Sequence, residues 1–270
     1  MVDVYTRIEQ QPAEVLEAIA RSMEVRASEP EMQNICASYM GSIARPRNPR
    51  ILEVGCGNGA TTKLILRYLD PATLVGVDPA GGLIDMAREA FVGVPHVSFA
   101  IGDAAATGQP DQSFDLVMAH TVYSHLPDPA AALAESHRVL KPEGRLTIFD
   151  GDYATITLAQ CDGDPLQAAV DIVLRHLVHA PYVMRRLPAI AASAGFVIEK
   201  VVPHGYVQTA SPEYLLTLLS RGLSAAVAAD EIGSALADGF NREARQRVES
   251  GTFYGAILFV SLTARKARTK

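Results

Sequence analysis

A glycine-rich segment carries the residues whose types and spacing best fit ligand binding. It reads Gly55-Cys56-Gly57-Asn58-Gly59, and Glu53 stands two positions before it. Glycines let a ligand approach backbone N–H groups closely, and the N-terminus of a following helix adds further donors. We expect Gly55, Gly57 and Gly59 to form a binding loop, with Cys56 buried in it as a small apolar side chain.

Two further acidic residues stand where strand-like segments end. Asp78 and Pro79 follow the second such segment, and Asp103 and Ala104 follow the third. The carboxyl ends of parallel strands meet at one edge of an α/β sheet, so these four residues should line the same site as the glycine loop. The glycine spacing also satisfies the dinucleotide fingerprint G-x-G-x-x-A, and Asp78 would hold ribose hydroxyls in either case. The glycines alone therefore leave a dehydrogenase open.

The segments after the fourth and fifth strand-like runs supply candidates for acid–base chemistry. His120 and Thr121 directly follow the fourth run, and we expect them beside a bound cofactor. His125 could take a proton from a second substrate as a general base, or could cap and pack the segment before the next helix. Asp152 and Tyr153 could orient that substrate or form a polar turn.

Strand-like and helix-like segments alternate from residue 50 onward, which predicts a parallel sheet covered by helices. The expected strands are residues 50–54, 73–77, 97–100, 114–119, 145–149, 197–202 and 255–262. We expect an α/β, Rossmann-like fold. Its seven-stranded, mostly parallel sheet has helices on both faces and an antiparallel last strand.

Helix-forming segments precede and interrupt this sheet. The expected division is an N-terminal helical lid segment and one main domain with two helical insertions: residues 1–45, then 46–270 with insertions at about 152–180 and 208–250. Three lid side chains could cover a cofactor or face solvent: Tyr5, Arg7 and Arg26. We expect a leucine stripe at residues 215–219 to pack in the core. The same stripe could instead cover a pocket or form a dimer interface. A homodimer is therefore left open.

Composition and charge narrow the class of partner. The chain has 270 residues, a net charge of −6 and no extended basic stripe, which argues against nucleic acid as a substrate. Its three cysteines are far apart, which favours a reducing compartment and no metal site. The N-terminus lacks a secretory signal pattern, and the apolar run at residues 256–262 is too short to span a bilayer. We expect a cytoplasmic protein without membrane contact.

Residues 50–202 resemble class I S-adenosylmethionine-dependent methyltransferases, in the small-molecule group that includes quinone-biosynthesis-type enzymes. Five segments carry the resemblance: Ile51-Leu52-Glu53-Val54-Gly55-Cys56-Gly57-Asn58-Gly59, Val75-Gly76-Val77-Asp78, Gly102-Asp103-Ala104, Phe114-Asp115-Leu116-Val117 and residues 135–144. The resemblance implies that Glu53 faces the cationic methionine end of the cofactor. It also implies that Asp78 holds the ribose and that Asp103 accepts a hydrogen bond from the adenine amino group.

The expected function follows from this resemblance. It implies methyl transfer from S-adenosyl-L-methionine, with S-adenosyl-L-homocysteine as product. The acidic charge, the helical insertions and the candidate bases favour a small organic acceptor methylated at oxygen, with nitrogen or carbon next. Two alternatives stay open: an NAD(P)-dependent oxidoreductase using the same loop, and a non-methylating cofactor-binding protein of this fold. Glu53 favours the methyltransferase, because a dinucleotide site usually has a small or apolar residue there.

Overall fold

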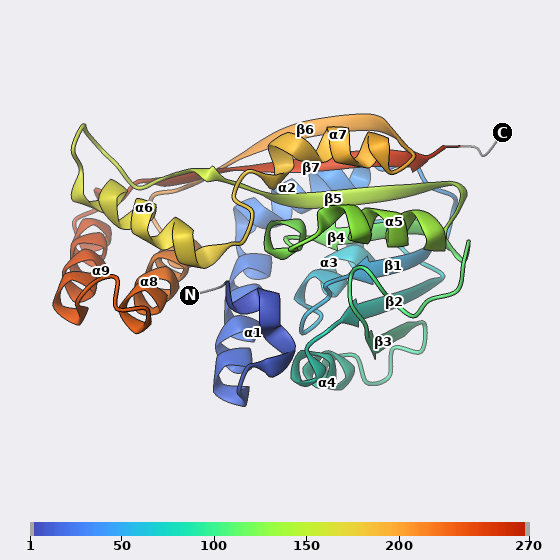
Figure 1. The fold of residues 1–270 in the computed structure, drawn as a ribbon, viewed down its shortest axis with the longest axis horizontal. Helices are drawn as coiled ribbons and strands as arrows, with labels where there is room; N and C mark the ends of the chain where they lie inside the picture. The colour runs from blue at the N-terminus through green and yellow to red at the C-terminus, as the bar shows by residue number, and fades with distance from the viewer. Residues whose placement is uncertain (1–2, 268–270) are drawn as a thin grey trace.

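A single mixed sheet organises the part of the chain that the computed structural model describes, residues 3–267 (Figure 1). Within these residues it has seven strands: β1 (Arg50–Val54), β2 (Thr73–Asp78), β3 (Val97–Ile101), β4 (Phe114–His120), β5 (Leu140–Thr157), β6 (Phe196–Gln208) and β7 (Gly255–Lys266). The order across the sheet is β3-β2-β1-β4-β5-β7-β6. Strands β1 to β5 pair in parallel, and β7 runs antiparallel between β5 and β6. The Rossmann-like sheet with an antiparallel last strand is thus confirmed.

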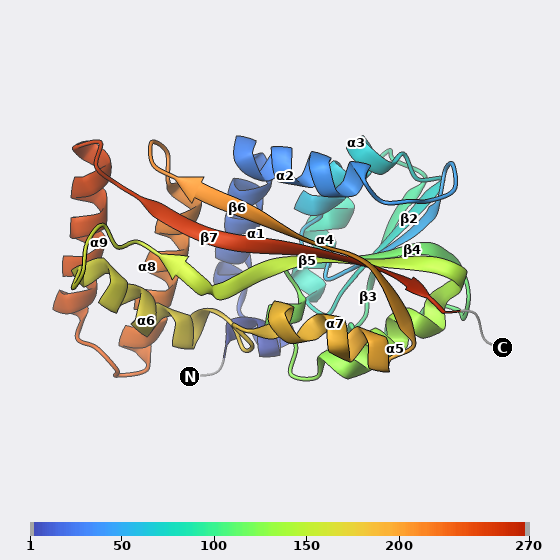
Figure 2. The ribbon, with the colours of Figure 1, turned by 90° about the horizontal axis from the view of Figure 1, so that it is seen from above.

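Helices cover both faces of the sheet (Figure 2). On one face lie α2 (Pro30–Gly41), α3 (Ala60–Leu69) and α4 (Gly81–Ala90); on the other lie α5 (Pro129–Val139) and α7 (Val183–Ser193). The central strands are apolar on both sides because both sides are covered. In β1, for example, Ile51 packs with the α2–α3 layer and Leu52 packs with the α5–α7 layer.

Three further helices gather around the far ends of β5, β6 and β7: α6 (Pro165–Leu177), α8 (Glu213–Ala228) and α9 (Ser234–Glu249) (Figure 1). The second expected insertion therefore contains a helix pair. The first differs from expectation, because β5 continues through Thr157 and the helix begins only at Pro165. In the leucine stripe, Leu215, Leu218 and Leu219 are buried against this helical end of the core.

The N-terminal segment folds as helix, as expected. A 3₁₀ helix, η1 (Val4–Gln10), is followed by α1 (Ala13–Ser28). Leu16 and Ile19 of α1 pack with Leu83 of α4, close to where the parallel strands end. The segment thereby closes over the edge of the sheet at which the expected site lies. Whether it works as a lid stays a prediction.

No helix within residues 3–267 is both long and apolar enough to cross a membrane. Within the same residues, no cluster of three or more histidine, cysteine, aspartate or glutamate side chains could hold a metal ion.

Candidate active site

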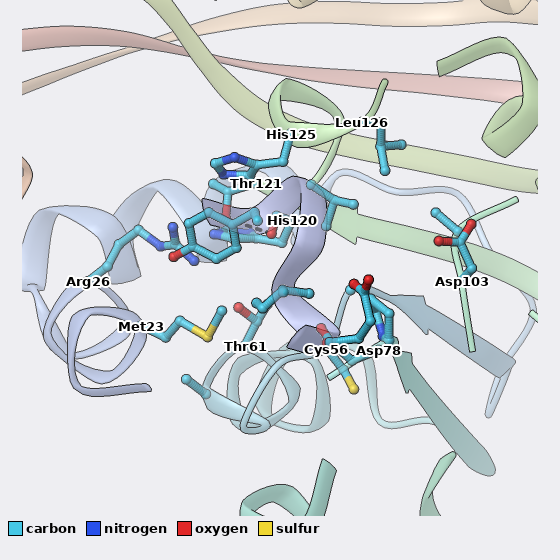
Figure 3. Close-up of a pocket in the computed structure, with 18 of the residues that line it drawn as sticks. Met23, Arg26, Cys56, Thr61, Asp78, Asp103, His120, Thr121, His125 and Leu126 are labelled. Atoms are coloured by element: carbon cyan, nitrogen blue, oxygen red, sulfur yellow. Dashed lines mark hydrogen bonds between the residues drawn. The ribbon is translucent and has the colours of Figure 1, made fainter. Parts of the chain in front are cut away.

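A pocket opens at the carboxyl ends of β1, β2 and β4, beneath η1 and α1 (Figure 3). It encloses about 860 Å³ of space, part of it open to solvent. Nine of the cofactor-binding and catalytic residues expected from the sequence line it: Gly55, Cys56, Asp78, Pro79, Asp103, Ala104, His120, Thr121 and His125. Two of the expected lid residues, Tyr5 and Arg26, line it as well. Asp78 and Asp103 lie at one end of the pocket and Arg26 at the other (Figure 3).

The glycine loop needs its glycines for two reasons. Gly55 and Gly57 have φ of +68° and +54°, where side chains are disfavoured. A Cβ on Gly55 would lie 2.4 Å from a methyl group of Val122, and one on Gly57 would lie 2.6 Å from the sulfur of Met23. Gly59, with φ of +82°, starts α3 and lies against Phe91 rather than in the pocket. The loop is therefore tightly enclosed and leaves its backbone facing the ligand space.

Asp78 joins the loop to the end of β2. Its two carboxylate oxygens accept hydrogen bonds from the backbone N–H groups of Gly57 and Ala80, each at 2.9 Å. Burial raises the pKa of Asp78 to about 6, although both backbone hydrogen bonds act to lower it. At neutral pH the group is still a carboxylate. It can therefore organise the loop and also accept from hydroxyls in the pocket.

Glu53 is buried at the end of β1, next to the loop. One carboxyl oxygen accepts a hydrogen bond from the Thr62 hydroxyl at 2.5 Å, and the other, Oε1, has no protein partner among the described residues. Burial raises the pKa of Glu53 to about 8; Thr62 lowers it and Asp78 raises it further. A buried oxygen without a partner is costly, so it indicates a group that the ligand or water supplies.

Asp103 follows β3 and is exposed at the rim of the pocket. Its Oδ1 accepts a hydrogen bond from the backbone N–H of Ala105 at 2.8 Å, which fixes the side chain. Ala104 beside it is buried. This arrangement leaves the other carboxylate oxygen of Asp103 available to a polar ligand edge.

His120 and Thr121 end β4 and lie between the two ends of the pocket (Figure 3). Nδ1 of His120 shares a hydrogen bond with the Tyr39 hydroxyl at 2.9 Å, and its ring stacks on Phe149. Burial, helped by the positive charge of Arg26, holds the pKa of His120 well below its ordinary value. His120 is therefore neutral and suits polar contact with a ligand rather than donation of an acidic proton. Thr121 has φ of +56°, a strained conformation of a kind often found at functional sites.

His125 lies at the end of a short 3₁₀ helix, η2 (Tyr123–His125), and faces the pocket. Its Nδ1 lies 2.6 Å from Oδ2 of Asp3, a residue of the N-terminal segment. The ring of Tyr5 packs on the imidazole with centroids 4.1 Å apart. Asp150 holds η2 in place, because its carboxylate accepts hydrogen bonds from the backbone N–H and the hydroxyl of Ser124. His125 is thus held by groups distant in sequence, with Nε2 left for a substrate.

Asp152 and Tyr153 lie on β5 outside this pocket. Arg185 donates to the carboxylate of Asp152 at 2.8 Å, and the other oxygen of that carboxylate is buried with no partner among the residues that the structure describes. Tyr153 is buried within the core, close enough to Arg26 and Arg221 for electrostatic interaction. The structure therefore separates these two residues from the nine that line the pocket.

Several lining residues were not expected from the sequence. They are mostly apolar or small: Ile8, Glu9, Met23, Ala60, Thr61, Val122, Leu126 and Pro127. Of these residues, Thr61 could most easily have been predicted from the sequence, because it follows the glycine loop at the start of α3. Met23 carries no signal of this kind, since it reaches the loop only through the packing of α1.

Comparison with known proteins finds similarity to methyltransferases. Residues 52–148 match a family model described as a methyltransferase domain. The chain is 36% identical over 125 residues to an uncharacterised methyltransferase of Schizosaccharomyces pombe, covering 43% of this chain and 45% of that protein. It is 31% identical over 120 residues to a trans-aconitate 2-methyltransferase of Acidovorax ebreus, covering 44% and 45% respectively. The match spans less than half the length of these relatives.

A solved structure of a methyltransferase from Bacillus halodurans has the same fold. It superposes with a TM-score of 0.62 at 18% identity, covering 87% of this chain and all of that one. The likeness thus extends beyond the segment of the family match to most of the sheet and its helices.

Proposed function

We propose that this chain binds S-adenosylmethionine in the pocket, because residues 52–148 match a methyltransferase domain. We propose further that it transfers the methyl group to a small organic acceptor, with oxygen as the methylated atom. The named relative that acts on trans-aconitate supports a small-molecule acceptor. When bound, the cofactor supplies a methyl group on a cationic sulfur, which leaves as a neutral thioether.

The observation that carries the proposal is the distribution of polar groups along the pocket. Glu53 is buried beside the loop rather than among the lining residues, and one of its oxygens has no partner within the described part of the chain, which suits the ammonium group of the cofactor. Asp78 and Asp103 lie at the opposite end from Arg26 and suit the ribose hydroxyls and the adenine amino group (Figure 3). Gly55 and Gly57 hold positive φ values in the loop, where a Cβ would clash with Val122 and Met23. The residues present therefore fit the cofactor.

His125 is the residue best placed to remove a proton from the acceptor. Asp3 at 2.6 Å from Nδ1 fixes the ring and stabilises the imidazolium that forms, while Nε2 takes the proton. The rest of the catalysis comes from holding the acceptor in line with the methyl group. In this arrangement the N-terminal segment completes the site, because Asp3 and Tyr5 both come from it.

The first test is titration calorimetry of the protein with S-adenosylhomocysteine and, separately, with NADH. We expect micromolar affinity for S-adenosylhomocysteine and no measurable heat with NADH, because a dinucleotide site usually has a small or apolar residue at the position of Glu53. The reverse pattern would establish the oxidoreductase instead. Cofactor binding without methylated product from any acceptor in a broad panel would favour a non-methylating protein.

A second prediction concerns the protonation of Glu53. Its pKa of about 8 means that the carboxyl is mostly protonated at pH 7, whereas the ammonium of the cofactor favours the carboxylate. Binding of S-adenosylhomocysteine at pH 7 should therefore release about one proton more from the wild type than from Glu53→Gln. Calorimetry in two buffers of different ionisation enthalpy measures this difference. Equal proton release by the two proteins would show that Glu53 does not face the ammonium group.

A further inference from the structure

Two arginines converge near His125 without a carboxylate of their own. Arg26 comes from α1 and Arg221 from α8, and neither forms a salt bridge within residues 3–267. Nη1 of Arg221 donates to the hydroxyl of Tyr5 at 3.3 Å, and its guanidinium lies over the Tyr5 ring, 5.3 Å from the centroid. Arg26 interacts electrostatically with Tyr214.

The two guanidinium groups share the same surroundings. Burial acts to lower the pKa of each, and interactions with Tyr5, Tyr153 and Tyr214 more than offset it, so both pKa values are raised. Tyr153 and Tyr214 are buried, and both arginines are partly enclosed. Tyrosine hydroxyls can accept hydrogen bonds, but they carry no negative charge at neutral pH. Two positive charges are therefore gathered in one partly enclosed place, and neither is paired in a salt bridge among the described residues.

Asp3, an acidic side chain that acts on Arg221, is already engaged. Asp3 attracts Arg221 electrostatically, but its carboxylate lies 2.6 Å from His125 Nδ1. It also accepts from the backbone N–H groups of Tyr5 and His179, at 3.1 and 3.0 Å. Partly enclosed cations cost free energy unless an anion pairs with them, and an arginine fork matches a carboxylate or phosphate well.

We propose that Arg26 and Arg221, with the hydroxyls of Tyr5, Tyr153 and Tyr214, form an oxyanion subsite that selects an acceptor bearing a carboxylate or phosphate group. This inference rests on the proposed methyl transfer. Tyr5 connects the subsite to the candidate base, because its ring contacts both the His125 imidazole and the Arg221 guanidinium. An acceptor anchored here by its anionic group presents its remaining functional groups to the pocket.

The cofactor has a carboxylate of its own, and Arg26 lines the pocket at the end away from Asp78 and Asp103. Arg26 can therefore serve either anion, whereas Arg221 does not line this pocket and reaches it only through Tyr5. The carboxylate of the cofactor and the anionic group of the acceptor predict different effects of replacing Arg221 on cofactor affinity. If the acceptor is the anion, loss of Arg221 leaves cofactor affinity unchanged.

The experiment measures binding of inorganic phosphate and of citrate to protein saturated with S-adenosylhomocysteine, by calorimetry at constant ionic strength. We expect weak binding of at least one anion by the wild type and a loss of about tenfold or more in Arg221→Met, which keeps most of the apolar stem. Arg221→Lys should retain part of the affinity. The matched control is Arg21→Met, on the exposed face of α1, which should bind as the wild type does.

The outcomes separate this inference from the proposed function. Absence of anion binding by the wild type, or equal binding by Arg221→Met and Arg21→Met, would overturn the oxyanion subsite. A loss of S-adenosylhomocysteine affinity in Arg221→Met of about tenfold would assign the arginine to the cofactor and also overturn it. Failure of the wild type to bind S-adenosylhomocysteine would instead contradict the proposed function. Circular dichroism confirms that each variant is folded, and Arg221→Lys serves if Arg221→Met is not.

Discussion

Replacement of Asp78 by asparagine is expected to weaken S-adenosylhomocysteine binding by about 100-fold or more. Asp78 accepts hydrogen bonds from the backbone N–H groups of Gly57 and Ala80 through separate oxygens. Asparagine has only one oxygen, so one of these N–H groups would face an amide NH₂. The same change removes the charged acceptor for the cofactor hydroxyls, and each lost hydrogen bond to a charged group is worth about 1.5–3 kcal/mol.

Calorimetry at pH 7.5 measures this effect where wild-type Asp78 is ionised. Since burial raises its pKa to about 6, the affinity of the wild type should also fall as the pH drops below 6, because the neutral carboxyl accepts less strongly. Asp85→Asn is the control, since this residue lies on the exposed face of α4 and pairs only with Arg88 among the described residues. Affinity of Asp78→Asn within about threefold of the Asp85→Asn value would exclude Asp78 from the cofactor site.

The parallel half of the fold could be predicted from local patterns. Strands β1 to β4 end where expected to within one residue, because each is a short apolar run closed by a glycine, an acid or a histidine. Their carboxyl ends meet at one edge, so the predicted cofactor residues come together without further information. Position at a strand end, rather than residue type alone, made these predictions succeed.

The end of β5 was less predictable because its polar residues resemble a turn. Asp150 and Asp152 continue the strand since distant groups satisfy them: Ser124 donates to the first and Arg185 to the second. The candidate site also depends on contacts between residues distant in sequence. Asp3 meets His125 across 122 positions of sequence. No local pattern encodes such a pair, so His125 could be named from sequence but its partner could not.

Replacement of His125 by alanine is expected to reduce kcat by about 10²- to 10⁴-fold, measured with an acceptor that the wild type methylates. The ring carries the Nε2 atom that we propose takes the proton, and no neighbouring group described here replaces it. The affinity for S-adenosylhomocysteine should stay within about twofold of the wild type, because the cofactor contacts lie on Glu53, Asp78 and Asp103. A comparable loss of cofactor affinity would mean that His125 acts on binding instead.

Asp3→Asn separates positioning from a merely structural role. The asparagine can still bond to the imidazole, so η1 should remain folded, but the negative charge that stabilises the imidazolium is gone. We expect a smaller loss of kcat than in His125→Ala and little change in KM. An unchanged kcat with a raised KM would mean that Asp3 only holds the N-terminal segment in place. In that case the proton of the acceptor leaves by a route that does not involve Asp3 and His125. A base that is oriented by a neighbouring charge must lose catalytic rate when that charge is removed.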